Sequence, residues 1–198
     1  TMTWNLICRS INTVMIQREH LSWNDDAMGC KFAHTKNDRV GDEAAYVRHI
    51  YGNPLMPWIC PLLSIARYLC MFPGRDTGLL FPGDAQYDRF RQILYQVVQE
   101  HADEIRSMGI DPDDIGVHSI RKGAATYCCS GTTTGVAYAA VCVRAHWSMG
   151  GVKDRYIKYA EAGDRVCGRT LAGLDVNSHE FSISPPLFAV SPEDEGLI

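Results

Sequence analysis

The chain has 198 residues, of which 46% are hydrophobic, and it carries a formal net charge of −4. This size and composition fit one ordinary globular core rather than two. No uninterrupted apolar run reaches the ~18 residues that a membrane helix needs. The N-terminal stretch TMTWNLICRS lacks the basic start and the small-residue cleavage site of a signal peptide. Because it begins within a helix-like pattern, we expect the sequence to be a fragment of a longer protein.

Hydrophobic spacing predicts an α+β, mostly helical domain with a small antiparallel sheet. The first helix is expected over residues 1–21. Residues 23–51 alternate short strand-like runs with turn signals such as Asn24-Asp25-Asp26, which favours two or three strands. Further helices are expected over residues 57–71, 84–107, 118–130, 134–145, 149–160 and 162–173. From Val176 onward the chain is expected to be extended.

The eight cysteines are Cys8, Cys30, Cys60, Cys70, Cys128, Cys129, Cys142 and Cys167, and none of them forms a CxxC pair. Zinc sites usually require such short paired spacings. A disulfide framework is unusual in a chain of this size without a secretory signal. We therefore expect reduced cysteines that pack as small apolar residues in an intracellular protein, with no metal and no cofactor.

Charge is distributed unevenly along the chain. Residues 118–171 hold eight Lys or Arg against three Asp or Glu, whereas residues 172–198 hold five acids and no Lys or Arg. Residues 101–117 hold five acids and one Arg. A basic segment between acidic ones can bind an anion while the whole chain stays acidic, but a solvated surface with uneven charge explains the pattern equally well.

Six residues are unusual in their setting: Arg9, Lys36, His118, Arg121, Trp147 and Tyr156. The first lies in an otherwise apolar predicted helix, and the second lies at a turn between predicted strands. His118 and Arg121 begin a helix and share one face because they are three residues apart. Nine positions separate the last two residues. Each residue alone has an ordinary explanation, such as packing or pairing with a carboxylate, but the ordered set weakens those explanations.

This ordered set resembles the catalytic domain of the tyrosine recombinases, the phage-integrase-type site-specific recombinases. That family carries an Arg in an early helix, a Lys on a β-hairpin, a His-x-x-Arg at a helix start, and a His or Trp nine residues before a nucleophilic Tyr. The resemblance covers residues 1–172, including the motif HSIR at 118–121. The segments RSINTVMIQREHLSW, FAHTKNDRVGD and FSISPPLF are most similar to recombinases of eukaryotic Crypton-type mobile elements.

The resemblance implies transesterification at a DNA phosphodiester, which leaves a 3′-phosphotyrosyl bond and a free 5′-hydroxyl and requires neither ATP nor a metal ion. Arg9 and Arg121 would bind the non-bridging oxygens with paired donors. Trp147 would donate an indole hydrogen bond to the phosphate. These three side chains and His118 should therefore face one concave basic surface.

The resemblance also assigns the proton transfers. A phenol has an unperturbed pKa of ~10, so Tyr156 needs a general base, for which His118 is the nearest candidate. Lys36 would return a proton to the 5′-oxygen leaving group.

The sequence departs from the family pattern at several positions. Asn12 stands where many relatives have an acid, Trp147 replaces the commoner His, and His146 is its neighbour. Tyr159 is a second tyrosine, expected on the helix face that carries Tyr156. Contacts to DNA backbone phosphates, which position a duplex without reading its sequence, are expected from Lys122, Arg144, Lys153, Arg155 and Lys158, although each could equally lie on a solvated helix face.

The resemblance implies a catalytic domain over residues 1–174, without the N-terminal domain that clamps DNA in relatives. Residues 175–198 would form an extended arm, partly disordered or docked on a neighbouring subunit. The expected partners are double-stranded DNA and further copies of the chain, as a tetramer on two duplexes in the nucleus, with no membrane. Three alternatives stay open: a type IB topoisomerase-like nicking-closing enzyme, a domesticated DNA-binding module without catalysis, and an unrelated helical domain.

Overall fold

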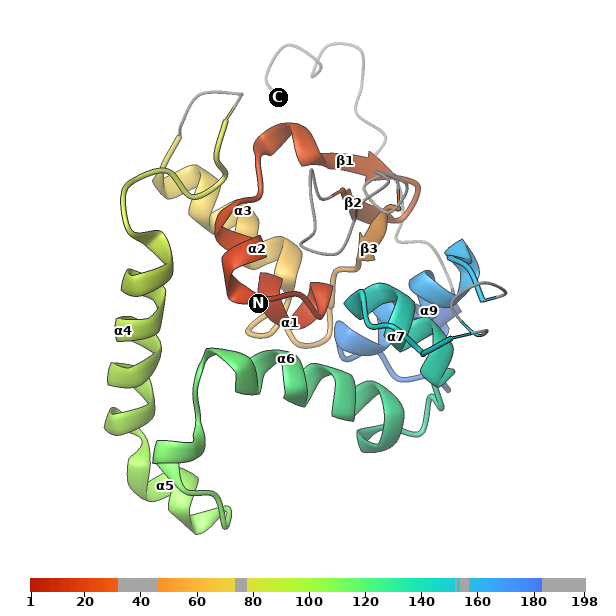
Figure 1. Cartoon of the computed structure of the whole chain (residues 1–198). Coiled ribbons are helices and arrows are strands. Elements are labelled where there is room, and N and C mark those ends of the chain that lie inside the picture. Colours follow the sequence, from red (N-terminus) through yellow and green to blue (C-terminus); the bar gives the residue numbers. More distant parts are fainter. Residues whose placement is uncertain (32–45, 74–77, 152, 154–156, 183–198) are drawn as a thin grey trace.

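The computed structural model describes residues 1–31, 46–73, 78–151, 153 and 157–182. Helices surround a small three-stranded antiparallel sheet (Figure 1), which confirms the predicted α+β, mostly helical class. Within the described ranges, no helix has both the length and the apolar character needed to cross a membrane.

The N-terminal region forms two short helices instead of the single helix expected over residues 1–21. Helix α1 (Met2–Leu6) ends at Ile7, whose backbone is left-handed with φ 47°, and α2 (Ser10–Val14) begins after Arg9, its N-cap. The break lets Ile7 and Cys8 enter two different clusters of buried side chains. Arg9 therefore lies exposed between two helices and not inside one.

The sheet has the small antiparallel form that the sequence predicts. A 3-10 turn, η1 (Arg18–His20), leads into β1 (Leu21–Asn24), which pairs with β2 (Ala27–Cys30), and β2 pairs with β3 (Arg48–Ile50). Lys36 belongs to the connection between β2 and β3 and lies outside the described residues.

Helices make up most of the remaining described chain. They are α3 (Pro61–Met71), α4 (Gln86–Glu100), α5 (Ala102–Ser107), α6 (Val117–Thr126), α7 (Tyr138–Ala145), α9 (Glu161–Leu171) and α10 (His179–Ser182), with a 3-10 turn η3 (Pro112–Asp114) and a π-helical turn η4 (Tyr127–Gly131). The helix expected over residues 84–107 is divided at His101. The helix expected over 134–145 starts later, after Gly135, whose φ is +63°. Residues 157–160, expected to end a helix, are not helical.

Two clusters of buried side chains meet at α1. One cluster joins α1 to the sheet and α3 and includes Leu6, and the other joins α1 to α6, η4, α7 and α9 and includes Ile7. Six of the eight cysteines are buried within the core, as expected for small apolar residues. Helices α4 and α5 stand to one side of these clusters (Figure 1), and Val98 is the buried residue of α4.

Arg144 of α7 holds several elements together from inside the core. Its side chain is 1% exposed, and its guanidinium forms an ion pair with Asp164 of α9. It also donates hydrogen bonds to the backbone oxygens of Asn5 (2.7 Å) and His49 (2.8 Å). The expectation that Arg144 contacts DNA phosphate is therefore wrong, because all of this charged group is enclosed by protein.

Asp164 completes the network around Arg144. Its carboxylate accepts hydrogen bonds from the backbone N–H of His49 (2.8 Å) and from His49 Nδ1 (2.9 Å). Burial alone would raise the pKa of Asp164, but Arg144 and the His49 hydrogen bonds outweigh burial and hold this pKa below its ordinary value.

Replacing Arg144 with Met should lower the free energy of unfolding by about 3–5 kcal/mol, because it leaves the Asp164 carboxylate buried without its cation. Urea unfolding followed by circular dichroism measures this loss. The matched control is Arg91→Met on the exposed surface of α4, which should change stability by less than about 0.5 kcal/mol. Equal losses in the two variants would contradict the structural role of Arg144.

Asp164 should also make the fold sensitive to acid. Since its folded pKa lies below the ordinary value near 3.8, its contribution is complete above that ordinary value and is lost as the pH falls from there through the folded pKa. The wild-type free energy of unfolding should fall more steeply than that of Asp164→Asn between about pH 5 and about pH 3, by up to ~1.4 kcal/mol per pH unit. Parallel pH profiles would refute this assignment.

Candidate functional site

The candidate site is a pocket along one face of α6. His118, Arg121, Lys122 and Ala125 follow at helical spacings of three and four residues and form its floor. The pocket is an open hollow with a volume of about 360 Å³. It is lined by His118, Arg121, Lys122, Ala125, Thr126, Cys129 and Ser130 from α6 and η4, and by Tyr138 and Trp147 from the two ends of α7.

Trp147 reaches the pocket because of the way α7 ends. The N–H of His146 donates to the carbonyl of Val143 (3.1 Å), and the N–H of Trp147 donates to the carbonyl of Cys142 (2.9 Å). These two bonds form a Schellman motif, in which His146 takes the left-handed position (φ 53°) that glycine usually occupies. The His146 ring contacts the guanidinium of Arg48, so Trp147 and not His146 lines the pocket.

The Arg121 guanidinium connects α6 to the end of α7. One Nη atom donates to the carbonyl of Ala145, the last residue of α7, where the helix dipole favours a cation. Its central carbon lies 5.3 Å from the ring centroid of Trp147, within the range of a cation–π contact. Arg121 Nε is buried and has no hydrogen-bond partner among the described residues. A buried unpaired donor is costly, so an acceptor that reaches Nε would be bound favourably.

Arg9 brings a second positive charge close to Arg121. Burial, followed by repulsion from Arg9, lowers the pKa of Arg121. No carboxylate within the described ranges pairs with either guanidinium. Cys8 also lies nearby but supplies no counter-charge, because burial raises the pKa of its thiol to about 11. The two arginines thus form a positive centre without an internal counter-ion in this part of the chain.

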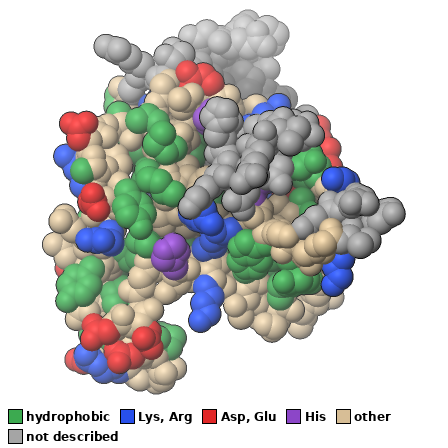
Figure 2. Space-filling view, in the orientation of Figure 1, with side chains coloured by type: hydrophobic (Ala, Val, Ile, Leu, Met, Phe, Trp, Pro, Cys, Tyr) green, Lys and Arg blue, Asp and Glu red, His purple; other side chains and the backbone are tan. Residues whose placement is uncertain are grey.

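Basic and acidic side chains lie in different places on this face of the molecule. Figure 2 shows Lys, Arg and His side chains gathered at the middle of the face where α1, α2 and α6 meet. On the same face, Asp and Glu side chains gather over α5, at the end of the molecule farthest from the sheet. No residue of the acidic segment 101–117 lines the pocket, so the pocket can attract an anion although the whole chain is acidic.

The structure brings together three of the six residues that the sequence singled out, because His118, Arg121 and Trp147 line one pocket. Arg9 does not line it, although its charge helps to lower the pKa of Arg121. Lys36 and Tyr156 lie outside the described residues, so their positions stay predictions.

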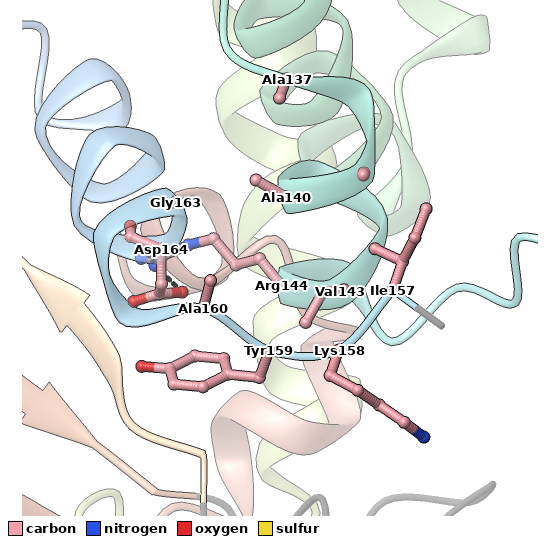
Figure 3. A pocket seen from close by; sticks show the side chains of 11 residues that line it. Ala137, Ala140, Val143, Arg144, Ile157, Lys158, Tyr159, Ala160, Gly163 and Asp164 are labelled. Carbon is pink, nitrogen blue, oxygen red and sulfur yellow. Dashed lines mark hydrogen bonds and ion pairs between the residues drawn. The ribbon is translucent and has the colours of Figure 1, made fainter. Parts of the chain in front are cut away.

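The residues expected to bind DNA are more dispersed. Lys122 lines the pocket and Lys153 is exposed, whereas Arg155 lies outside the described residues. Lys158 borders a second pocket of about 240 Å³ between α7 and α9, from which its side chain points away (Figure 3).

Tyr159 lies in the second pocket and is held by its neighbours (Figure 3). Its hydroxyl donates to the carbonyl of Val47 (2.7 Å), and its ring stacks on Tyr46 with centroids 4.6 Å apart. Burial, followed by the charges of Asp164 and Glu161, raises its pKa to about 12. The sequence predicts Tyr159 on the helix face that carries Tyr156. This expectation is wrong, because Tyr159 lies in a non-helical segment.

Several of the residues that line the pocket along α6 were not identified from the sequence. Thr126 and Cys129 follow Lys122 by four and seven residues, so the helical spacing that links His118 to Arg121 could have found them. Ser130 and Tyr138 carry no such signal, because their positions depend on η4 and on the turn that follows it.

Comparisons with known proteins do not extend these observations. No family model, no curated protein and no solved structure matches this chain. In the described ranges, no three His, Cys, Asp or Glu side chains are grouped so that they could hold a metal ion. The Lys and Arg side chains that line the pocket are Arg121 and Lys122.

Inorganic phosphate should bind this pocket and raise the melting temperature. At ten times the dissociation constant, binding adds about 1.4 kcal/mol, which corresponds to roughly 3–6 °C for a chain of this size. Differential scanning fluorimetry with increasing phosphate at constant ionic strength measures the shift. Arg121→Gln should abolish it, whereas Arg91→Gln on α4 should retain it. A phosphate response unaltered by Arg121→Gln would rule out this pocket as the anion site.

Proposed function

We propose that this chain is the catalytic domain of a tyrosine recombinase, which cleaves and rejoins DNA through a 3′-phosphotyrosyl bond. The observation that carries the proposal is that His118, Arg121 and Trp147 line one pocket, where Arg121 Nε is buried without a hydrogen-bond partner among the described residues and Arg121 also feels the positive charge of Arg9. Placing two guanidiniums together costs repulsive energy, and a bound phosphodiester would offset this cost by accepting hydrogen bonds from both.

In the proposed reaction the phosphodiester occupies the His118–Arg121 end of the pocket. The Tyr156 oxygen attacks phosphorus, and His118 accepts the phenol proton. The bond from phosphorus to the 5′-oxygen breaks, and Lys36 gives that oxygen a proton. A 5′-hydroxyl from another strand then attacks the phosphotyrosine and releases Tyr156.

The protein's contribution to the rate is mainly electrostatic. Negative charge spreads over the non-bridging oxygens as the bond to Tyr156 forms, and Arg9 and Arg121 would bind it. Arg121 is held by the Ala145 carbonyl and by the Trp147 ring, so it needs little rearrangement. The indole N–H of Trp147 can donate a further hydrogen bond to phosphate.

The proposal extends to partners and setting. Double-stranded DNA is the substrate, and several copies of the chain act together on two duplexes, in the integration of a mobile element in the nucleus. Lys122, Lys153 and Lys158 are the remaining described candidates for contacts with backbone phosphates, which would position the duplex.

Tyr156→Phe should abolish covalent attachment to DNA and leave DNA binding unchanged, because it removes only the attacking oxygen. Since the target site is unknown, the substrate is a pool of nicked duplexes with randomised sequence. Covalent adducts are trapped with detergent, recovered with the protein and sequenced. Tyr159→Phe is the matched control and should still form adducts, since its hydroxyl is engaged with Val47.

The other outcomes separate the alternatives. Adducts that persist in Tyr156→Phe and disappear in Tyr159→Phe would show that Tyr159 is the nucleophile. DNA binding without adducts in the wild type would favour a non-catalytic DNA-binding module. Relaxation of supercoiled DNA by a monomer, without enrichment of any sequence, would favour a topoisomerase-like enzyme.

A further inference from the structure

The pocket along α6 is longer than one phosphate group needs. Its floor runs from His118 to Cys129, which corresponds to about 16 Å along a helix axis. Its volume of about 360 Å³ falls in the range of sites that hold small organic ligands. The positive groups Arg121 and Lys122 lie toward the His118 end, so the other half of the pocket is left for a different part of the ligand.

That other half is neutral and carries an exposed aromatic ring. Ala125, Thr126, Cys129 and Ser130 form the floor and Tyr138 forms the wall, with no Lys, Arg, Asp or Glu among them. Tyr138 is 66% exposed, although it lines a concave surface. A tyrosine in this position offers a flat face for stacking without a large loss of side-chain entropy.

Trp147 forms the wall at the opposite end of α7 and is 38% exposed. Within the described ranges, neither Trp147 nor Tyr138 is stacked on another aromatic ring. The pocket therefore combines the cationic groups of Arg121 and Lys122 with the exposed ring of Tyr138, whereas the Trp147 ring is already in contact with Arg121. Basic groups interleaved with stacking faces are typical of sites for single-stranded nucleic acid, in which unpaired bases stack on aromatic side chains.

We propose that this pocket is a nucleotide subsite, which binds a phosphate at Arg121 and stacks an unpaired base against Tyr138. As a statement about DNA strand exchange it rests on the proposed function, whereas nucleotide binding itself does not. In the strand-exchange setting, the base next to the cleaved phosphate leaves the duplex stack and enters the neutral half of the pocket. Duplexes with an unpaired base at that position would bind better, because moving an unpaired base out of the stack costs less free energy than moving a paired one.

The test compares inorganic phosphate with a nucleoside 3′-monophosphate by isothermal titration calorimetry. The wild-type chain should bind the nucleotide roughly 5- to 150-fold more tightly than phosphate, which is the range expected for one base–aromatic stack. Tyr138→Ala should remove this advantage and leave phosphate affinity unchanged. Tyr138→Phe should keep it, because the ring remains, and Arg121→Gln should weaken both ligands.

Tyr95→Ala supplies the matched control. Tyr95 lies on α4, outside the pocket, and is 61% exposed, so it resembles Tyr138 in exposure but not in location. This variant should bind both ligands like the wild type. Equal wild-type affinities for phosphate and nucleotide, or an unchanged nucleotide affinity in Tyr138→Ala, would overturn the subsite.

This result is separable from the outcome for strand exchange. If the Tyr138-dependent preference appears but no DNA pool yields covalent adducts, the nucleotide subsite stands and the recombinase proposal fails. If adducts form but the nucleotide binds no better than phosphate, the recombinase proposal stands and the subsite fails.

Discussion

The buried ion pair between Arg144 and Asp164 is the interaction on which the candidate site depends. Arg144 precedes Ala145, so the same turn of α7 that is fixed in the core offers its last carbonyl to Arg121. Breaking a buried pair is costly, although such a pair is weak evidence for net stability. Here its effect is geometric, because one guanidinium bonds to α1, β3 and α9 and thereby sets the position of α7 and of Trp147.

The partly buried positive charge of Arg121 is tolerated because its surroundings reduce the free energy of burying a cation without supplying a full negative charge. Arg121 is bound by a helix C-terminus and an aromatic ring, which attract a cation but carry no full negative charge. Arg9 gains its position from the left-handed turn at Ile7, which interrupts the first helix and places the residue at the start of α2. The result is a cationic site at which no carboxylate of the described ranges forms an ion pair with Arg121.

The sequence predicted those features that depend on local spacing. The α+β class, a small antiparallel sheet of two or three strands and the shared face of His118 and Arg121 all follow from periodicity and turn residues, and the structure has three strands. The break at Ile7 was missed because neither glycine nor proline marks it. Arg144 was assigned to the surface because charge along a sequence does not reveal burial, yet its flanks, VCV and AH, are mostly apolar. The recombinase fold, Lys36 and Tyr156 stay predictions.

The π-helical turn η4 makes the structure after α6 depend on the number of residues in this part of the chain. It widens the last turn after α6 and keeps Cys129 and Ser130 in the pocket. Removing one residue there would restore regular α-helical winding and rotate everything that follows by about 100°, including the connection that delivers Tyr138. The number of residues in the turn therefore determines which of its side chains face the pocket and where the connection to α7 leads.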